Sequence, residues 1–144
     1  GCPVGSVLAG SSPFIEEVWR WKQRIGGAMR QAGFLAAAGL YAFEHNLERL
    51  ADDHKNAKRL GQMLSAVEGV TLAPGVVETN IVFFNVSATG LDANAISAGL
   101  EAQGINIGAF TPTMMRAVTH LDVNSAQIEE AGQVFVDVVS RLRA

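Results

Sequence analysis

A helical pattern that runs from residue 29 to residue 67 constrains how this chain can fold. Residues 32–42 are small or apolar on every side, as in a helix that its neighbours enclose and approach closely. Further on, apolar residues recur at helical spacing between charged ones, among them Asp53, which we assign to the solvated outer face. An unbroken helix of this extent would be about 55 Å long. Since that is too long for one small domain, we expect a straight or bent connecting helix at residues 34–68.

The segment before this helix reads as the end of a larger domain, at residues 1–33. Residues 4–9 form a short aliphatic run between Pro3 and Gly10, which predicts a strand buried on both faces. No neighbouring strand is indicated for about sixty residues after it, so we expect its partners upstream of Gly1. A helix rich in aromatic residues follows and is predicted to end at Gly26 and Gly27.

The segment after the long helix predicts a small α+β domain at residues 69–144. Strands are indicated at residues 70–73, 80–86, 105–108 and 115–120. Asp92 is suited to cap a helix that Gly104 closes, and Asn124 or Ser125 is suited to cap a final helix. This order predicts helices on one face of a largely antiparallel sheet, within an α/β chain.

Composition excludes several classes of function. The net charge of −3 and pI of about 5.6 argue against nucleic-acid binding. One cysteine, Cys2, allows no internal disulfide and no cysteine-rich zinc site, which makes the cytoplasm the simplest compartment. No apolar run reaches the ~20 residues of a membrane span.

Two site motifs are also missing. His45 and His54 lie on opposite sides of a helix, so no metal site is expected. Leu8 stands where the serine-nucleophile motif G-x-S-x-G needs its second glycine.

Arg116 is the first candidate site residue. The two-residue period of a strand places Arg116, Val118 and His120 on one side and their alternate neighbours on the other. A guanidinium among apolar neighbours in a half-buried strand needs an anion. Either a structural partner, such as Asp122 or a more distant carboxylate, or the carboxylate of a ligand would satisfy the pattern.

The second candidate is the element Gly26-Gly-Ala-Met-Arg30. Glycines ahead of a helix can let its positively polarised end approach an anion, and Arg30 in the first turn would add charge. A simple break between two helices has the same pattern. Both interpretations stay open on the residues alone.

Several motifs, taken in order, closely resemble the low-specificity L-threonine aldolases. They are Pro3-Val-Gly-Ser-Val-Leu-Ala-Gly10, Arg20-Trp21, Gly26-Gly-Ala-Met-Arg-Gln-Ala-Gly33, Leu35-Ala-Ala-Ala-Gly39, Asp53-His54 and Met115-Arg-Ala-Val-Thr-His-Leu-Asp-Val123. The resemblance implies the C-terminal part of a fold-type I enzyme that uses pyridoxal 5'-phosphate. It also implies cleavage of L-threonine or L-allo-threonine to glycine and acetaldehyde, and a homotetramer built from dimers.

The resemblance further implies how the site is divided. The family's cofactor lysine lies just upstream of the Pro3 motif, so no catalytic residue is expected in this segment and the upstream half of the polypeptide is a required partner. Arg116 matches the arginine that holds the substrate α-carboxylate. The Gly26–Arg30 element is expected to approach the cofactor or a neighbouring subunit's site, with Arg30 as the expected cofactor contact. The alternatives are another fold-type I activity, β-elimination or aminotransfer, or a non-catalytic fragment.

Two positions depart from the family pattern. Many relatives have a lysine where this chain has Gln23, and a third glycine where it has Ala28. Lys22 or Arg24 could replace the lost charge, although their side chains leave a helix about 100° to either side of Gln23. Substrate preference could therefore differ from that of the relatives.

Overall fold

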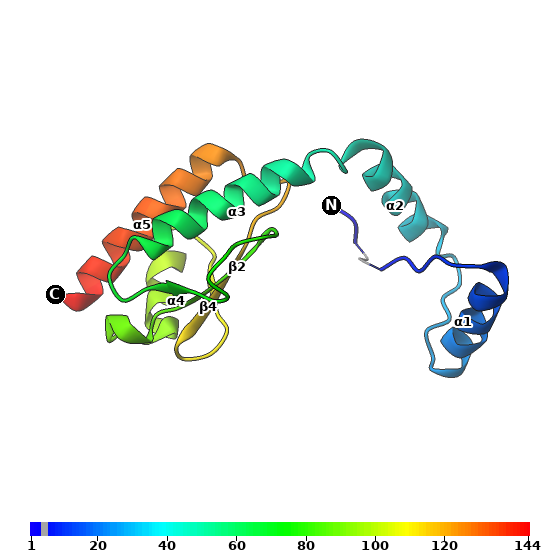
Figure 1. The fold of residues 1–144 in the computed structure, drawn as a ribbon, viewed down its shortest axis with the longest axis horizontal. Coiled ribbons are helices and arrows are strands. Elements are labelled where there is room, and N and C mark those ends of the chain that lie inside the picture. The colour runs from blue at the N-terminus through cyan, green and yellow to red at the C-terminus, as the bar shows by residue number, and fades with distance from the viewer. Residues whose placement is uncertain (4–5) are drawn as a thin grey trace. The chain divides into compact units, whose positions relative to one another are not determined.

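The computed structural model describes residues 1–3 and 6–144, which separate into two compact units, Gly1–Leu47 and Glu48–Ala144 (Figure 1). The helices are α1 (Ser12–Arg24), α2 (Gly33–His45), α3 (Leu50–Ser65), the short 3-10 helix η1 (Ser87–Thr89), α4 (Ala93–Glu101) and α5 (Ser125–Arg143). The strands are β1 (Thr71–Leu72), β2 (Ile81–Asn85), β3 (Gly108–Ala109) and β4 (Met114–Val118).

The unit Glu48–Ala144 is a four-stranded antiparallel sheet with helices on one face. The strand order is β1-β2-β4-β3, and every neighbouring pair is antiparallel. Figure 1 shows α3 and α5 lying side by side, and both α3 and α4 contact strands of the sheet. The predicted antiparallel sheet with its helices on one face is confirmed. The other face of the sheet stays open.

The core lies between the sheet and these helices. Apolar residues at helical spacing turn inward from α3, α4 and α5, and alternate residues of β2 and β4 meet them. The rings of Phe84 on β2 and Phe135 on α5, both fully buried, meet edge to face with centroids 5.6 Å apart. Gly132 lets α5 approach Met63 of α3 so closely that a Cβ there would collide with its side chain.

Helix ends in this unit follow the predicted caps. The Asp92 side chain accepts from the backbone N–H of Asn94 at the start of α4. At the start of α5, Asn124 Oδ1 accepts from Gln127 N at 3.0 Å, and Gln127 Oε1 accepts from Asn124 N at 2.9 Å. This reciprocal pair is a capping box, so the predicted cap at Asn124 is confirmed.

The third strand is displaced from its predicted position. The sequence predicts a strand at 105–108, whereas β3 comprises only Gly108–Ala109. The reason is the end of α4, where Ile105 N donates to Leu100 O and Gly104 N donates to Glu101 O around a left-handed Gly104. These paired bonds form a Schellman motif, which uses the backbone N–H of Ile105 that a strand beginning at residue 105 would need.

The unit Gly1–Leu47 has no buried residue among those described. Twelve large apolar side chains of this unit are exposed: Val7, Leu8, Phe14, Trp19, Trp21, Ile25, Met29, Phe34, Leu40, Tyr41, Phe43 and Leu47. Of the strand predicted at 4–9, residues 4–5 lie outside the described residues, and residues 6–9 form no strand, with Val7 80% exposed. A strand needs hydrogen-bonded neighbours, and the described part of this unit provides none.

The helical pattern of residues 34–68 is also interrupted. In place of one continuous helix, α2 ends at His45, turns follow at residues 46–49, and α3 begins at Leu50. Asn46 caps α2, and asparagine favours helix ends because its side chain competes for backbone hydrogen bonds. The division into domains at 1–33, 34–68 and 69–144 stays a prediction.

An ion pair on the surface joins α3 to α5. Arg59 donates to both carboxylate oxygens of Glu129, at 2.5 and 2.7 Å. The hydrogen bond from Arg59, with its charge, lowers the pKa of Glu129, and the same bond raises the pKa of Arg59. A carboxylate with a depressed pKa stabilises the fold above its unfolded pKa and loses that contribution as pH falls through the folded value.

The first prediction concerns the capping box. Asn124→Ala should lower the free energy of unfolding by about 1 kcal/mol, because the orphan N–H of Gln127 loses its acceptor. Equilibrium urea denaturation measures the change. Ser125→Ala, one residue later in α5, is the matched control and should change stability by less. Equal losses in the two variants would contradict the assignment.

The second prediction concerns Glu129. Its carboxyl group should titrate below the ordinary glutamate range, and Arg59→Gln should move the midpoint back toward that range. NMR detection of the side-chain carboxyl carbon across an acid titration measures both midpoints. Identical midpoints with and without Arg59 would show that the pair does not persist in solution.

Candidate functional site

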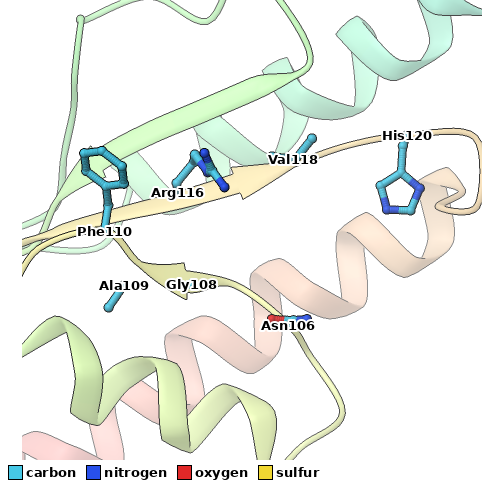
Figure 2. A pocket seen from close by; sticks show the side chains of 7 residues that line it. All are labelled: Asn106, Gly108, Ala109, Phe110, Arg116, Val118 and His120. Carbon is cyan, nitrogen blue, oxygen red and sulfur yellow. The ribbon is translucent and has the colours of Figure 1, made fainter. Parts of the chain in front are cut away.

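A cavity of about 300 Å³ lies on the open face of the sheet, at the β3–β4 edge (Figure 2). It is lined by Asn106, Gly108, Ala109, Phe110, Arg116, Val118 and His120. These residues come from two neighbouring strands and the segments that continue them, as Figure 2 shows. The cavity combines one permanent cation with apolar and amide neighbours.

Side chains alternate between the two faces of the sheet along β4, and this alternation places Arg116 at the cavity. Met115, Ala117 and Thr119 are buried, whereas Arg116 and His120 are exposed on the other side. This is the two-sided arrangement that the sequence predicts. The sheet register then sets Arg116 directly opposite Phe83 of β2 and directly opposite Gly108 of β3.

Arg116 has no carboxylate partner among the described residues. The ion pairs of that part of the chain are Arg49–Asp53, Arg59–Glu129 and His120–Asp122. Asp122, the structural partner that the sequence suggests for Arg116, lies instead 3.4 Å from His120 Nδ1. Because the face is open, water can solvate the guanidinium, and the cation is available to an anionic ligand.

Apolar side chains surround the guanidinium on its own face. Phe83 and Phe110 meet edge to face with centroids 5.5 Å apart, and Val118 follows Arg116 by two residues. Ile81 lies opposite Val118 in the register. Apolar walls lower the local dielectric constant, so an ion pair with Arg116 would be stronger here than in bulk water.

Buried polar contacts hold the end of β4. Thr119 Oγ1 donates to Asp53 O at 2.7 Å, and Thr119 N donates to Asn80 O at 2.9 Å. Asn80 Nδ2 returns a bond to Thr119 O at 2.8 Å. These bonds fasten the strand to α3 and to the start of β2, and therefore fix the backbone between Arg116 and His120.

Asp53 corrects one expectation from the sequence. Its place in a charged helical stretch suggests a solvated side chain, but the residue is only 4% exposed. Arg49 donates to its two carboxylate oxygens at 3.1 and 3.4 Å, which satisfies the buried charge. Only the i,i+4 spacing of Arg49 and Asp53 pointed to this pair, and spacing cannot show that Asp53 is buried.

The Gly26–Arg30 element is a helix end followed by turns. Gly26 N donates to Gln23 O, Gly27 N donates to Lys22 O, and Gly26 is left-handed, so the two glycines close α1 in a Schellman motif. Since α2 begins only at Gly33, Arg30 lies in a turn and not in the first helical turn. The structure therefore favours the helix-break interpretation for the glycines.

The cations beside Gln23 are already engaged. Lys22 Nζ lies 5.5 Å from the centre of the Trp19 ring, and the Arg24 guanidinium lies 5.2 Å from that of Trp21. Both distances allow cation–π contact. Arg30 and Arg116 belong to different units, and of these two candidates only Arg116 lines the cavity.

The structure describes residues 1–3 and 6–144. Within them, no group of three or more His, Cys, Asp or Glu side chains is placed to hold a metal ion. None of the helices found there is both long enough and apolar enough to cross a membrane.

Comparisons with known proteins give the chain a family context. A family model described as beta-eliminating lyase matches residues 1–89. The low specificity L-threonine aldolase of Escherichia coli (strain K12) is 37% identical over 130 residues, which cover 90% of this chain and 37% of that protein. Low-specificity L-threonine aldolase 1 of Arabidopsis thaliana is 36% identical over 129 residues, covering 89% of this chain and 36% of the relative. The chain thus spans just over a third of the length of these relatives.

Solved structures share the fold. The cystine C-S lyase C-DES, in complex with its reaction product cysteine persulfide, matches with a TM-score of 0.61 and 24% identity. The match covers 74% of this chain and 28% of C-DES. A mutant of C-DES with glycine covalently linked to its PLP cofactor matches equally well.

The third prediction tests the buried contacts of β4. Thr119→Val keeps the side-chain volume but removes the donor to Asp53 O, so the free energy of unfolding should fall by about 1–3 kcal/mol. Thr113→Val, an exposed position just before β4, is the control and should change stability little. Urea denaturation measures both variants. A Thr119→Val variant as stable as the parent would show that the hydroxyl is dispensable.

Proposed function

This chain belongs to the beta-eliminating lyase family, and we propose that it forms part of a lyase that depends on pyridoxal 5'-phosphate. The reaction is retro-aldol cleavage of L-threonine, L-allo-threonine and related β-hydroxy-α-amino acids to glycine and an aldehyde. The names of the relatives support this choice. The observation that carries it is Arg116, exposed on the open sheet face without a carboxylate partner among the described residues.

Arg116 holds the α-carboxylate of the amino acid. A guanidinium presents two parallel N–H donors that match the two oxygens of a carboxylate. The apolar neighbours Phe110 and Val118 line the same cavity, and Phe83 packs against Phe110. Fixing the carboxylate orients the Cα–Cβ bond that breaks, while Thr119 and Asn80 keep the supporting strand in place.

Arg30 is the residue of this chain that fits the cofactor. It is exposed in the turn before α2, and none of the ion pairs among the described residues includes it. Its planar fork suits the phosphate group. When bound, pyridoxal phosphate supplies an electron sink for the bond cleavage. The cofactor lysine lies in the part of the polypeptide that the family resemblance places upstream.

The assembly is a homotetramer built from dimers, in the cytoplasm. The unit Gly1–Leu47 supports an assembly because its apolar side chains, such as Trp19 and Phe34, have no core to bury them among the described residues. Exposed apolar area of this kind favours association. The upstream half of the polypeptide and further copies of the chain are the partners we propose for it.

The second candidate is β-elimination or aminotransfer by the same fold. The likeness to C-DES, a C-S lyase, favours elimination as the alternative. Products separate the reactions, because phenylserine would yield glycine and benzaldehyde by aldol cleavage, whereas serine would yield pyruvate and ammonia by elimination. Chromatography of the products formed from threonine, phenylserine and serine decides between them.

The fourth prediction concerns Arg116 in the full-length protein. Arg116→Ala should raise KM for threonine by about 10- to 100-fold, the equivalent of one charge-assisted bond, while cofactor content stays unchanged. Arg116→Lys should give a smaller rise, because it keeps the charge and loses the fork. Arg141→Ala, at the end of α5, is the control. Steady-state kinetics and the ratio of bound cofactor to protein measure the outcome.

Equal losses of cofactor and of substrate binding in Arg116→Ala would remove the carboxylate assignment. The visible absorption spectrum of the full-length protein gives a separate test of the cofactor. A cofactor band that shifts when glycine is added supports the proposal. A protein that stays colourless after incubation with pyridoxal phosphate would overturn it.

A further inference from the structure

Gly108 occupies the middle of one side of the cavity. Asn106, Gly108 and Phe110 follow one another at two-residue intervals along the β3 segment, and Arg116, Val118 and His120 do so along the β4 segment (Figure 2). Gly108 is the register partner of Arg116. Directly opposed residues of an antiparallel pair point to the same face, with Cβ atoms about 4.5–5.5 Å apart. The position beside the guanidinium therefore lacks a side chain.

The fold itself does not require glycine at this position. Gly108 is not among the residues with positive φ, so its backbone conformation suits any L-residue. A Cβ placed on it would meet no atom of the described residues within 4 Å, so packing among them does not exclude one either. Glycine within a strand costs about 0.5–1 kcal/mol relative to alanine. Neither the backbone conformation nor packing among the described residues explains this glycine, whereas close approach of a ligand would.

On the other side of Arg116, the facing residue of β2 carries a large side chain. Phe83 of β2 stands directly opposite Arg116, and its ring meets that of Phe110 edge to face. On the Gly108 side, a Cβ would meet no atom of the described residues within 4 Å. A planar carboxylate that binds both donors of the guanidinium has room to lie on the Gly108 side.

We propose that Gly108 is a specificity-determining residue, whose missing side chain leaves open the space through which an amino-acid carboxylate reaches Arg116. The ligand class is an α-amino acid bound by its carboxylate, with the backbone of Gly108 in contact. The proposal rests on the proposed function, because it concerns the same cavity. Any branched side chain at residue 108 narrows this entry without touching the guanidinium.

The test uses the full-length holoenzyme with Gly108→Ala and Gly108→Val. Gly108→Val should raise KM for threonine at least 10-fold with kcat changed less than 3-fold. The reason is that the substitution weakens binding of the substrate and of the transition state equally and leaves the chemical step unchanged. Gly108→Ala should give an intermediate rise. Tm should stay the same or increase in both, since the added atoms enter open space and valine favours strands.

Gly75→Val is the matched control. A Cβ on Gly75 also meets no atom within 4 Å, its φ is not positive, and it lies outside the cavity. The same substitution there should leave KM within 2-fold of the parent. A comparable rise in KM for Gly75→Val would show that the effect at Gly108 is not local, and would overturn the proposal.

A double variant links Gly108 to the arginine. If the valine acts by blocking Arg116, its effect on KM should largely disappear in an Arg116→Ala background. Fully additive effects would overturn the proposal, as would an unchanged KM in Gly108→Val or a parallel loss of kcat and Tm. An unchanged KM in Arg116→Ala alone would instead remove the carboxylate assignment, which distinguishes failure of the proposed function from failure of this inference.

Discussion

The burial of β4 on one side only is the constraint on which the described site depends. Met115 and Ala117 enter the core under the helices, and Thr119 binds the backbone of α3 and of the segment before β2. Because successive side chains of a strand alternate, burying this row forces Arg116 onto the opposite face. A slip of one residue would bury the guanidinium and expose the core row, so the register is strongly specified.

The two units differ in how their apolar residues are used. Glu48–Ala144 encloses a core around Phe84 and Phe135, with capped helices on one face of the sheet. Gly1–Leu47 encloses none among its described residues, although the chain as a whole is 49% hydrophobic. Burial of apolar area is the main favourable term in folding, and the described residues of Gly1–Leu47 include none that is buried. The chain spans just over a third of its relatives' length.

The chemistry of the cavity follows from one cation held by a rigid strand. Arg116 projects from a central strand whose neighbours on both sides are paired, and Asp53 and Asn80 anchor its end through Thr119. Such support keeps a binding group in one orientation. The cavity thus presents one exposed cation that has no carboxylate partner among the described residues.

The sequence by itself determined the features that depend on local rules. Helix caps at Asp92 and Asn124, the order of elements after residue 69 and the alternation of side chains along β4 could be predicted, because capping groups and two-residue periods act over a few residues. Tertiary structure alone decided that Asp53 is buried and that Gly108 lies beside Arg116. These facts depend on which distant segments pair, and spacing along the chain does not encode that pairing.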